Sequence, residues 1–316
     1  MRAVTINDRA LSITDLPAPE PGSAEVLVRV RACGLNGADL LQLKGRYAAP
    51  PGAPADIPGL EMAGEVVGLG PGATRFAVGD RVMGILGGGG QAELCVAHER
   101  VLMPVPEGLS WAEAGGLAEV FTTAHDALFT QGGLRAGERL LVHGAAGGVG
   151  SAAVQLGRAA GARVTASVRN PDSRDQVAAL GAKVIAPDGF EDHGPFDVIL
   201  ELVGGPNLPG NLEALDLDGR IVVIGVGAGR TSELDLQQVM QKRARIFGST
   251  LRARPLEQKA ATARAVERSV LPFIADGSVT VPVAATFPLE QAQAAYDRFS
   301  AGGKHGKIVL VLPEKS

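Results

Sequence analysis

The stretch from His143 to Gly150, HGAAGGVG, constrains the possible fold more than any other part of the chain. It follows an apolar run, Arg139 to Val142, and precedes a segment with helical spacing. A strand that turns tightly into a helix needs small residues there, so that backbone amides can approach a phosphate and the helix can pack on the sheet. Ala145, Gly147 and Gly150 occupy the three small-residue positions of a dinucleotide-binding turn, with Ala in the first place. A glycine-rich turn without a ligand is the alternative for this string taken alone.

Length, charge and cysteine content limit the class of protein. At 316 residues the chain exceeds the usual size of one domain, so we expect two compact units. The net charge of -4 gives no general attraction to nucleic acid or to an anionic membrane. Two cysteines, Cys33 and Cys95, are too few for a disulfide framework or a four-thiolate zinc site and suit a reducing compartment. The N-terminal residues lack the apolar core of a signal peptide, and we expect a cytoplasmic protein without membrane contact.

Short strand-like runs separated by Gly and Pro fill the first 110 or so residues. Their spacing predicts a strand-rich domain, a distorted barrel, with strands at Val26–Ala32, Gly64–Leu69 and Arg81–Leu86. One helix is predicted at Gly37–Lys44. It leads into a proline-rich loop, Gly45–Pro58, that carries Tyr47, one of only two tyrosines.

Helices and apolar strands alternate after Ser110, which we expect to cap a helix. The predicted strands are 139–142, 163–168, 184–186, 196–203, 220–226 and 245–251, and the predicted helices between them are 151–160, 172–180 and 207–215. This alternation is typical of a parallel sheet covered on both faces, which is the context that a phosphate-binding turn requires. We therefore predict cofactor contacts along the turn, by Ala145, Ala146, Gly147, Gly148, Val149 and Gly150.

The last quarter of the chain predicts one long helix at 256–275, a β segment at 279–285, a helix at 289–299 and a closing strand at 307–312. A tail of this length after a complete nucleotide-binding sheet is expected to return to the first domain. The predicted fold is α/β, with a doubly wound parallel Rossmann sheet at 122–251 and a β-rich catalytic domain built from 1–121 and 252–316.

The residues after the second predicted strand of the sheet bear on the choice of cofactor. An NAD-binding turn usually has an Asp or Glu about 20 residues beyond the glycines, to bind the adenine ribose hydroxyls. This chain has no acid there and offers Ser167, Arg169 and Asn170 instead, with Arg174 one turn later. Because an Arg pairs with a 2'-phosphate that a carboxylate would repel, the pattern favours NADPH over NADH. The alternative is that Arg169 and Arg174 are ordinary solvated charges.

Further cofactor contacts are expected where strands of the sheet end at its carboxyl edge, since open α/β folds bind ligands there. Val203, within Leu202–Gly204, and Gly225, within Gly225–Gly227, are the candidates. Thr122, beside Thr123 at the expected start of a helix, is another candidate, although threonines in such places often only cap the helix. Lys304 is a further candidate, with a solvated lysine as the alternative.

Several motifs in one order across nearly the whole chain resemble those of the zinc-free quinone oxidoreductases of the medium-chain dehydrogenase/reductase superfamily, the group that includes zeta-crystallin. The matching stretches are CGLNGADLLQLKGRY, PGLEMAGEV, VGDRVMGIL, GGGGQAELCVAHERVLMPVPEGLS, HGAAGGVG and GKIVLVLP. The resemblance implies a GroES-like catalytic domain formed by both chain ends, a Rossmann domain between them, and a homodimer.

The resemblance also indicates which residues decide whether the protein can bind zinc. A zinc-dependent relative would have Cys at Asn36 and His at Leu60, and neither replacement is a good zinc ligand, although Glu61 keeps its family position. The four-cysteine lobe of the zinc relatives has no counterpart between Gly84 and Val101. We therefore expect no bound metal, and a structural role for Cys33.

Without a metal the site cannot strongly polarise an alcohol, so the acceptor must carry its own electron sink. Quinones meet that need, and conjugated alkenals or alkenones are the close alternative. By resemblance, Asn36 lies near the nicotinamide and the substrate through its amide, and Tyr47 contributes a ring wall or a hydroxyl donor. The structural alternatives are a turn-forming Asn and a loop aromatic that covers the core.

One departure from the family pattern concerns the sheet. The connection between the third and fourth sheet strands, PDGFEDHGPF, is shorter than the helix-containing one usual in relatives, so that edge should be trimmed. A basic cluster invites a different class of function, an NADPH-binding structural or RNA-contacting protein: Lys242, Arg243, Arg245, Arg252 and Arg254. Because it lacks interleaved aromatic residues and the net charge is negative, a solvated face is the simpler interpretation, and we expect no nucleic acid partner.

Overall fold

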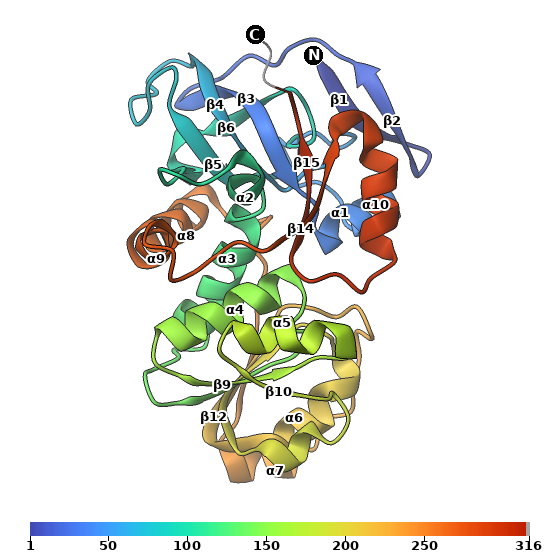
Figure 1. The fold of residues 1–316 in the computed structure, drawn as a ribbon, viewed down its shortest axis with the longest axis vertical. Coiled ribbons are helices and arrows are strands. Elements are labelled where there is room, and N and C mark those ends of the chain that lie inside the picture. Colours follow the sequence, from blue (N-terminus) through green and yellow to red (C-terminus); the bar gives the residue numbers. More distant parts are fainter. Residues whose placement is uncertain (314–316) are drawn as a thin grey trace. The chain divides into compact units, whose positions relative to one another are not determined.

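We describe residues 1–313 in a computed structural model of the chain. The chain divides into two compact units. The first comprises Met1–Thr122, Leu251–Gly302 and residues 307–313, and the second comprises Thr123–Thr250 with the short segment Gly303–Gly306. Figure 1 labels most of the elements of the two units.

The second unit contains a six-stranded sheet in the order β10-β9-β8-β11-β12-β13, in which every neighbouring pair is parallel. The strands are β8 (Arg139–Val142), β9 (Arg163–Ser167), β10 (Lys183–Ile185), β11 (Phe196–Glu201), β12 (Leu215–Val223) and β13 (Arg245–Gly248). Chain order reverses between β8 and β11, which are adjacent at the centre of the sheet. The predicted doubly wound parallel sheet is thus confirmed, and the reversal lies at the place where open α/β sheets usually bind ligands.

Helices connect these strands, and apolar side chains of the sheet pack beneath them. They are α4 (Gly148–Ala159), α5 (Arg174–Ala179), α6 (Leu208–Ala214) and α7 (Leu236–Lys242), with single 3₁₀ turns at Pro171–Ser173 and Gly205–Asn207. Between β10 and β11 the chain forms only a 3₁₀ turn, Phe190–His193. The predicted shortening is therefore present: β10 is an edge strand, and no α-helix lies between it and β11.

The first unit is built on a seven-stranded sheet in the order β14-β15-β3-β4-β5-β7, with β6 paired to β3. Its strands are β3 (Glu25–Gly34), β4 (Glu61–Leu69), β5 (Arg81–Ile85), β6 (Leu94–His98), β7 (Leu102–Pro104), β14 (Val283–Pro288) and β15 (Lys307–Val311), beside a two-stranded hairpin of β1 (Arg2–Asn7) and β2 (Ala10–Asp15). β15, near the end of the chain, pairs antiparallel with β3, so the blue and red segments of Figure 1 share one sheet. The end of the chain thus pairs with a strand from its first part.

The helices of the first unit are short, except for one of 14 residues. They are α1 (Gly37–Leu43), α2 (Trp111–Gly115), α3 (Ala118–His125, whose last three residues belong to the second unit), α8 (Leu256–Ser269), α9 (Leu271–Ala275) and α10 (Ala292–Ser300), with 3₁₀ turns at Glu99–Val101 and Leu289–Gln291. Ser110 caps α2 as expected, since its hydroxyl accepts a hydrogen bond from the Glu113 N–H at 3.3 Å. A core of β3, β4, β15 and α10 side chains, including Val28, Met62, Tyr296 and Leu310, stabilises this unit.

Two helix predictions were wrong. The helix predicted at 256–275 is interrupted at Val270, because Pro272 lacks the N–H that a continuous helix needs. Thr122 and Thr123 were expected at the start of a helix but lie in the second half of α3, after which residues Asp126–Gln131 widen into a π-helical turn.

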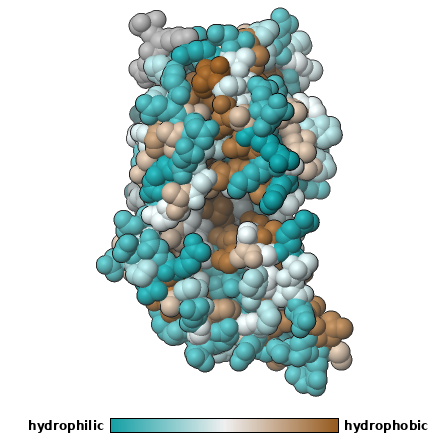
Figure 2. All heavy atoms as spheres, turned by 90° about the vertical axis from the view of Figure 1, so that its right-hand side faces the viewer, coloured by the Kyte–Doolittle hydropathy of each residue, from teal (hydrophilic) through white to brown (hydrophobic). Residues whose placement is uncertain are grey.

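Both units have exposed large apolar side chains, and those of the second unit are Leu217, Val226, Leu234, Leu236, Met240 and Ile246. Three of them belong to α7 and to the edge strand β13. Figure 2 shows one face of the molecule, on which most of the surface is hydrophilic and apolar side chains are visible in several places, among them a small group at the lower right. In the described part of the chain, no helix has both the length and the apolar character needed to cross a bilayer.

Candidate functional site

The glycine turn joins β8 to α4 and leaves its outer surface open. A Cβ at Gly150 would lie 2.5 Å from the Gly144 carbonyl oxygen, so this position must be small for the helix to pack on the turn. Gly147, the residue that caps α4, is exposed, and a Cβ there would meet nothing closer than 3.4 Å. Backbone N–H groups in the first turn of a helix have no acceptor within the helix, and the helix dipole makes this end positive. The turn therefore suits a pyrophosphate.

A buried hydrogen-bond network supports the turn from below, beginning at His143. The Asn211 amide donates to Glu201 Oε2 at 2.8 Å, so its Oδ1 accepts from His143 Nε2, also at 2.8 Å. His143 Nδ1 is then free to accept from the Ser167 hydroxyl at 3.0 Å. Burial lowers the pKa of His143, which keeps the ring neutral. The network thus joins the ends of β8, β9 and β11 at the edge where chain order reverses.

Glu201 also fixes the loop after β11. Its Oε1 accepts hydrogen bonds from the backbone N–H groups of Val203 at 2.6 Å and Gly204 at 2.8 Å. A Cβ at Gly225 would lie 2.2 Å from the Leu202 carbonyl oxygen, so the loops that follow β11 and β12 are in contact. Val203 and Gly225 therefore lie together at the carboxyl edge of the sheet, as the sequence predicts for residues near a cofactor.

The residues expected at the adenosine end of the cofactor surround the end of β9. Ser167 is buried, whereas Arg169 is exposed and forms no ion pair or hydrogen bond within residues 1–313. Asn170 caps the following turn, since its Oδ1 accepts from the Asp172 N–H at 3.2 Å. Arg174 Nε donates to the Val168 carbonyl at 3.2 Å, which holds its guanidinium at this edge.

Lys304 belongs to a short segment, Gly303–Gly306, that packs with the second unit although its neighbours belong to the first. A Cβ at Gly303 would lie 3.7 Å from Asn170 Nδ2. This contact brings the segment of Lys304 to the end of β9, where the candidate residues for the adenosine phosphate lie.

A second polar centre lies in the first unit, where Asn36 meets a buried ion pair. Lys307 Nζ lies 2.6 Å from Glu61 Oε1, and the two side chains are 3% and 0% exposed. The Lys307 ammonium also donates to Asn36 Oδ1 at 2.6 Å and to the Leu35 carbonyl at 2.9 Å. Asn36 Nδ2 in turn donates to Glu61 Oε1 at 3.0 Å. The Asn36 amide is therefore bonded at both ends within this network.

The carboxylate of Asp39 completes this centre. It accepts hydrogen bonds from the backbone N–H groups of Asn36 at 2.8 Å and Gly59 at 3.1 Å, which ties the start of α1 to the loop before β4. Burial raises the pKa of Asp39 to about 7, against the effect of these two bonds and of Lys307. Leu60, at the second position where a zinc relative has a ligand, is a buried hydrocarbon that is 3% exposed.

Tyr47 lies in the proline-rich loop and is half-buried. Burial raises the pKa of its hydroxyl group, with Arg252 acting in the opposite direction, so the group remains a hydrogen-bond donor at neutral pH. Arg252 was grouped with a basic surface cluster in the sequence, but its side chain is 3% exposed. The cluster is therefore smaller than the sequence suggests, because Arg252 packs inside the first unit.

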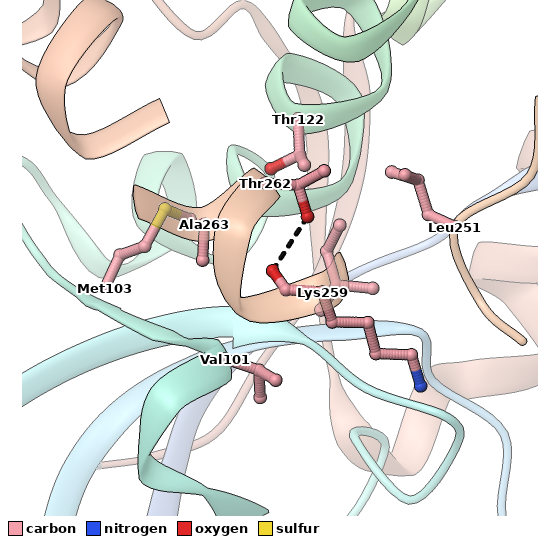
Figure 3. Close-up of a pocket in the computed structure, with 8 residues that line it drawn as sticks. Val101, Met103, Thr122, Leu251, Lys259, Thr262 and Ala263 are labelled. Carbon is pink, nitrogen blue, oxygen red and sulfur yellow. Dashed lines mark hydrogen bonds between the residues drawn. The ribbon is translucent and has the colours of Figure 1, made fainter. Parts of the chain in front are cut away.

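Thr122 faces a small cavity within the first unit (Figure 3). The cavity has a volume of about 20 Å³, enough for a single water molecule, and apolar side chains such as Val101, Met103 and Ala263 contribute to its wall. Thr122 is 2% exposed, and its Oγ1 has no hydrogen-bond partner among residues 1–313.

Sequence reasoning missed the partners on which these centres depend: His143, Glu201, Arg252 and Lys307. His143 and Lys307 were within motifs that we singled out, HGAAGGVG and GKIVLVLP, but neither had a role assigned. A buried Glu at the end of an apolar strand, as in FDVILELV, was the signal for Glu201. Nothing in the sequence distinguished Arg252 from the exposed cations near it.

Family comparisons agree with this architecture. Residues 22–132 match the model of the alcohol dehydrogenase GroES-like domain, and residues 148–267 match that of the zinc-binding dehydrogenases. Quinone oxidoreductase from Mus musculus is 33% identical over 314 residues, which cover 95% of this chain and 92% of that protein.

Solved structures give the same result. An NAD-dependent alcohol dehydrogenase aligns with a TM-score of 0.86 at 29% identity, over 99% of this chain and 100% of its own. The quinone oxidoreductase from Coxiella burnetii aligns with a TM-score of 0.80 at 25% identity, over 99% of both chains. The fold and the site thus define an oxidoreductase of the medium-chain dehydrogenase/reductase superfamily, with a GroES-like domain and a Rossmann domain. Within that superfamily, the chain belongs to the quinone oxidoreductase family.

Proposed function

We propose that this protein is an NADPH-dependent reductase that transfers hydride to a quinone without a metal ion. The observation that carries the proposal is the ion pair at Glu61. A zinc relative would place a divalent cation beside this carboxylate, whereas here the Lys307 ammonium neutralises it and Asn36 and Leu60 replace the ligands. Within residues 1–313, no group of three or more His, Cys, Asp or Glu side chains is arranged to hold a metal. A quinone suits this site because it delocalises the incoming charge itself.

The choice of NADPH rests on the end of β9. Arg169 is exposed and without a partner in the described chain, Arg174 is held nearby, and the segment of Lys304 adjoins Asn170. When bound, the nicotinamide supplies the hydride. The N–H groups of Gly148, Val149 and Gly150 would hold the pyrophosphate, and Val203 and Gly225 would line the path of the cofactor. Thr122 remains a proposed contact.

The proposed roles at the acceptor divide between Tyr47 and Asn36. The Tyr47 hydroxyl group makes no hydrogen bond to another residue in the described chain, and its raised pKa keeps the proton in place. It can therefore donate to an oxygen on which negative charge develops. Asn36, whose amide is bonded to Lys307 and Glu61, contributes by holding the start of α1 in position.

The proposal is tested by following NADPH and NADH oxidation with an ortho-quinone, a para-quinone and an alkenal. We expect turnover with at least one quinone and a higher kcat/KM with NADPH than with NADH. Turnover of the alkenal alone would assign the alternative, reduction of a conjugated C=C bond. Binding of NADPH without turnover of any acceptor would favour the NADPH-binding structural or RNA-contacting protein. About one tightly held zinc per chain in purified protein would contradict the metal-free site.

Arg169→Ala tests the cofactor assignment. Loss of a charge-assisted hydrogen bond of about 1.5–3 kcal/mol should raise the Kd of NADPH by roughly 10- to 100-fold, and that of NADH by much less. Binding is measured by the fluorescence of the reduced nicotinamide. Arg135→Ala, which removes an exposed Arg from the loop before β8, serves as the matched control. Equal loss for both cofactors would remove Arg169 from the 2'-phosphate site.

We further propose a homodimer formed through the second unit. β13 is an edge strand with exposed residues, and an unpaired strand edge favours pairing with another chain. The exposed fractions of Leu236 and Met240 on α7, 66% and 76%, give this side an apolar surface that a partner would cover. Both cysteines are buried free thiols, which supports the cytoplasm as the proposed compartment.

A further inference from the structure

Arg252 joins three segments of the first unit from a buried position. Its Nε donates to the Gly87 carbonyl at 2.8 Å, its Nη1 to the Tyr47 carbonyl at 3.3 Å, and its Nη2 to Gln42 Oε1 at 2.7 Å. The guanidinium carbon also lies 4.9 Å from the centroid of the Tyr47 ring. One side chain thus contacts both the backbone and the ring of Tyr47.

The two loops that Arg252 joins are packed on each other. The Gly89 N–H donates to the Ile57 carbonyl at 2.9 Å, and the Gly90 N–H donates to the Gly59 carbonyl at 3.1 Å. A Cβ at Gly87 would lie 2.7 Å from the Cβ of Ala53, so the glycine run 87–90 lies directly against the proline-rich loop. These loops form one surface, and Tyr47 is its aromatic side chain.

This arrangement has an energetic cost. None of the groups that accept from Arg252 is a carboxylate, and burial of a guanidinium without one is unfavourable. Burial accordingly lowers the pKa of Arg252. A neutral side chain of similar length would avoid the cost, but it could not donate three hydrogen bonds in the planar arrangement that these acceptors require.

We propose that Arg252 is a positioning residue that fixes Tyr47 and the glycine run 87–90 as one preformed wall of the acceptor site, and so determines which quinones bind well. The inference rests on the proposed function for its substrate. A wall fixed before binding reduces the ordering that the acceptor must bring about, which is why removal of Arg252 should affect KM more than kcat.

Steady-state kinetics with a para-quinone tests the role of Arg252. In Arg252→Met we expect KM for the quinone to rise roughly 10-fold or more, with kcat within about 3-fold and KM for NADPH unchanged. Arg252→Lys should not restore KM, because an ammonium group cannot reach three separate acceptors in one plane. Arg268→Met, which removes an exposed Arg of α8, should resemble the wild type.

A double-mutant cycle distinguishes positioning from general destabilisation. If Arg252 acts through Tyr47, then Arg252→Met should change kcat/KM by less than about 3-fold when it is added to Tyr47→Ala. Fully additive effects of the two substitutions would overturn the proposal.

Hydrogen–deuterium exchange tests, without reference to activity, whether Arg252 holds the Tyr47 loop and the glycine run 87–90 in place. In Arg252→Met, and in Gln42→Met should the first variant fail to fold, we expect faster exchange in peptides that cover 45–58 and 86–91, with no change in the β1–β2 hairpin. Unchanged exchange in both loops would refute the inference. If the wild type reduces no quinone but both loops exchange faster in the variant, the proposed function fails, while the role of Arg252 in holding the loops is supported.

Discussion

Lys307 and Glu61 form an ion pair whose members are both almost fully buried. Such a pair adds little net stability when complete, because desolvation offsets attraction, but removing one partner leaves an isolated charge in the core. At this site the charge would lie beside Asn36 and below the start of α1. The pair therefore fixes the local geometry more than it stabilises the fold.

We predict that Lys307→Met lowers the free energy of unfolding by about 3–5 kcal/mol, because Glu61 loses its counter-ion. Urea denaturation measures the change. Adding Glu61→Gln should recover part of the loss, because the unpaired charge is then absent. Lys44→Met, at an exposed position, should change the free energy by no more than about 0.5 kcal/mol. A cost below about 1 kcal/mol for Lys307→Met would show that the pair is not required.

At the residue scale, the sequence identified the positions of site residues better than the side chains that they contact. Asn36, Leu60 and Glu61 could be singled out because a family motif fixes their places. Lys307 could not be assigned to Asn36, since the two lie 271 positions apart and meet only because β15 pairs with β3. Arg252 was misplaced for a related reason, since burial depends on loops far away in the sequence.

At the scale of elements, two glycines in the turn between β8 and α4 are small for different reasons. Gly150 is small because the Gly144 carbonyl lies against it, whereas Gly147 has open space where a ligand would approach. The φ of -75° at Gly147 is accessible to any residue, so its conformation does not require glycine.

The two glycines should therefore respond differently to Ala. Gly147→Ala is expected to lower stability by no more than about 1 kcal/mol, as for an unfavourable cap, while weakening NADPH binding roughly 10-fold or more because its Cβ occupies the cradle. Gly150→Ala should cost about 1–3 kcal/mol, because the helix must shift. Thermal unfolding and NADPH titration measure the two effects. Similar losses of stability in both variants would contradict this assignment.

Element types were predicted well where periodicity was strong, as in the parallel strands and in the helix after the glycine turn. Their ends were less accurate. α4 begins at Gly148 instead of Ser151, because the turn glycines themselves adopt helical geometry. β12 begins at Leu215, before the apolar run from which it was predicted, because Leu215 already pairs with Phe196, and regular pairing resumes at Arg220 after an irregularity.

At the scale of the whole molecule, the exposed edge strand and α7 lead to a prediction about assembly. We expect the wild type to sediment at about twice the chain mass of 32.4 kDa. Met240→Glu combined with Ile246→Lys should yield monomers, because charges would replace the apolar surface beside β13. The variant should still bind NADPH, which shows that it is folded. Dimers that persist in the variant would place the interface elsewhere.

The returning tail was foreseen from its length and its closing strand, but its exact division was not. The segment Gly303–Gly306 packs with the second unit while β15, immediately after it, enters the sheet of the first. No local pattern in this glycine-rich loop indicates that four of its residues pack with the other unit, because the segment's contacts and not its composition determine where it packs.

The position of β15 has a consequence for synthesis on the ribosome. The main segment of the second unit, Thr123–Thr250, is continuous and is translated completely before the tail appears. The first unit, in contrast, lacks a central strand of its sheet until residues 307–311 have emerged. Because domains fold as units during translation, the unit that begins the chain is the one completed last. Until then Glu61 lacks the Lys307 ammonium as its counter-ion, and the edge of β3 that pairs with β15 can pair with other chains.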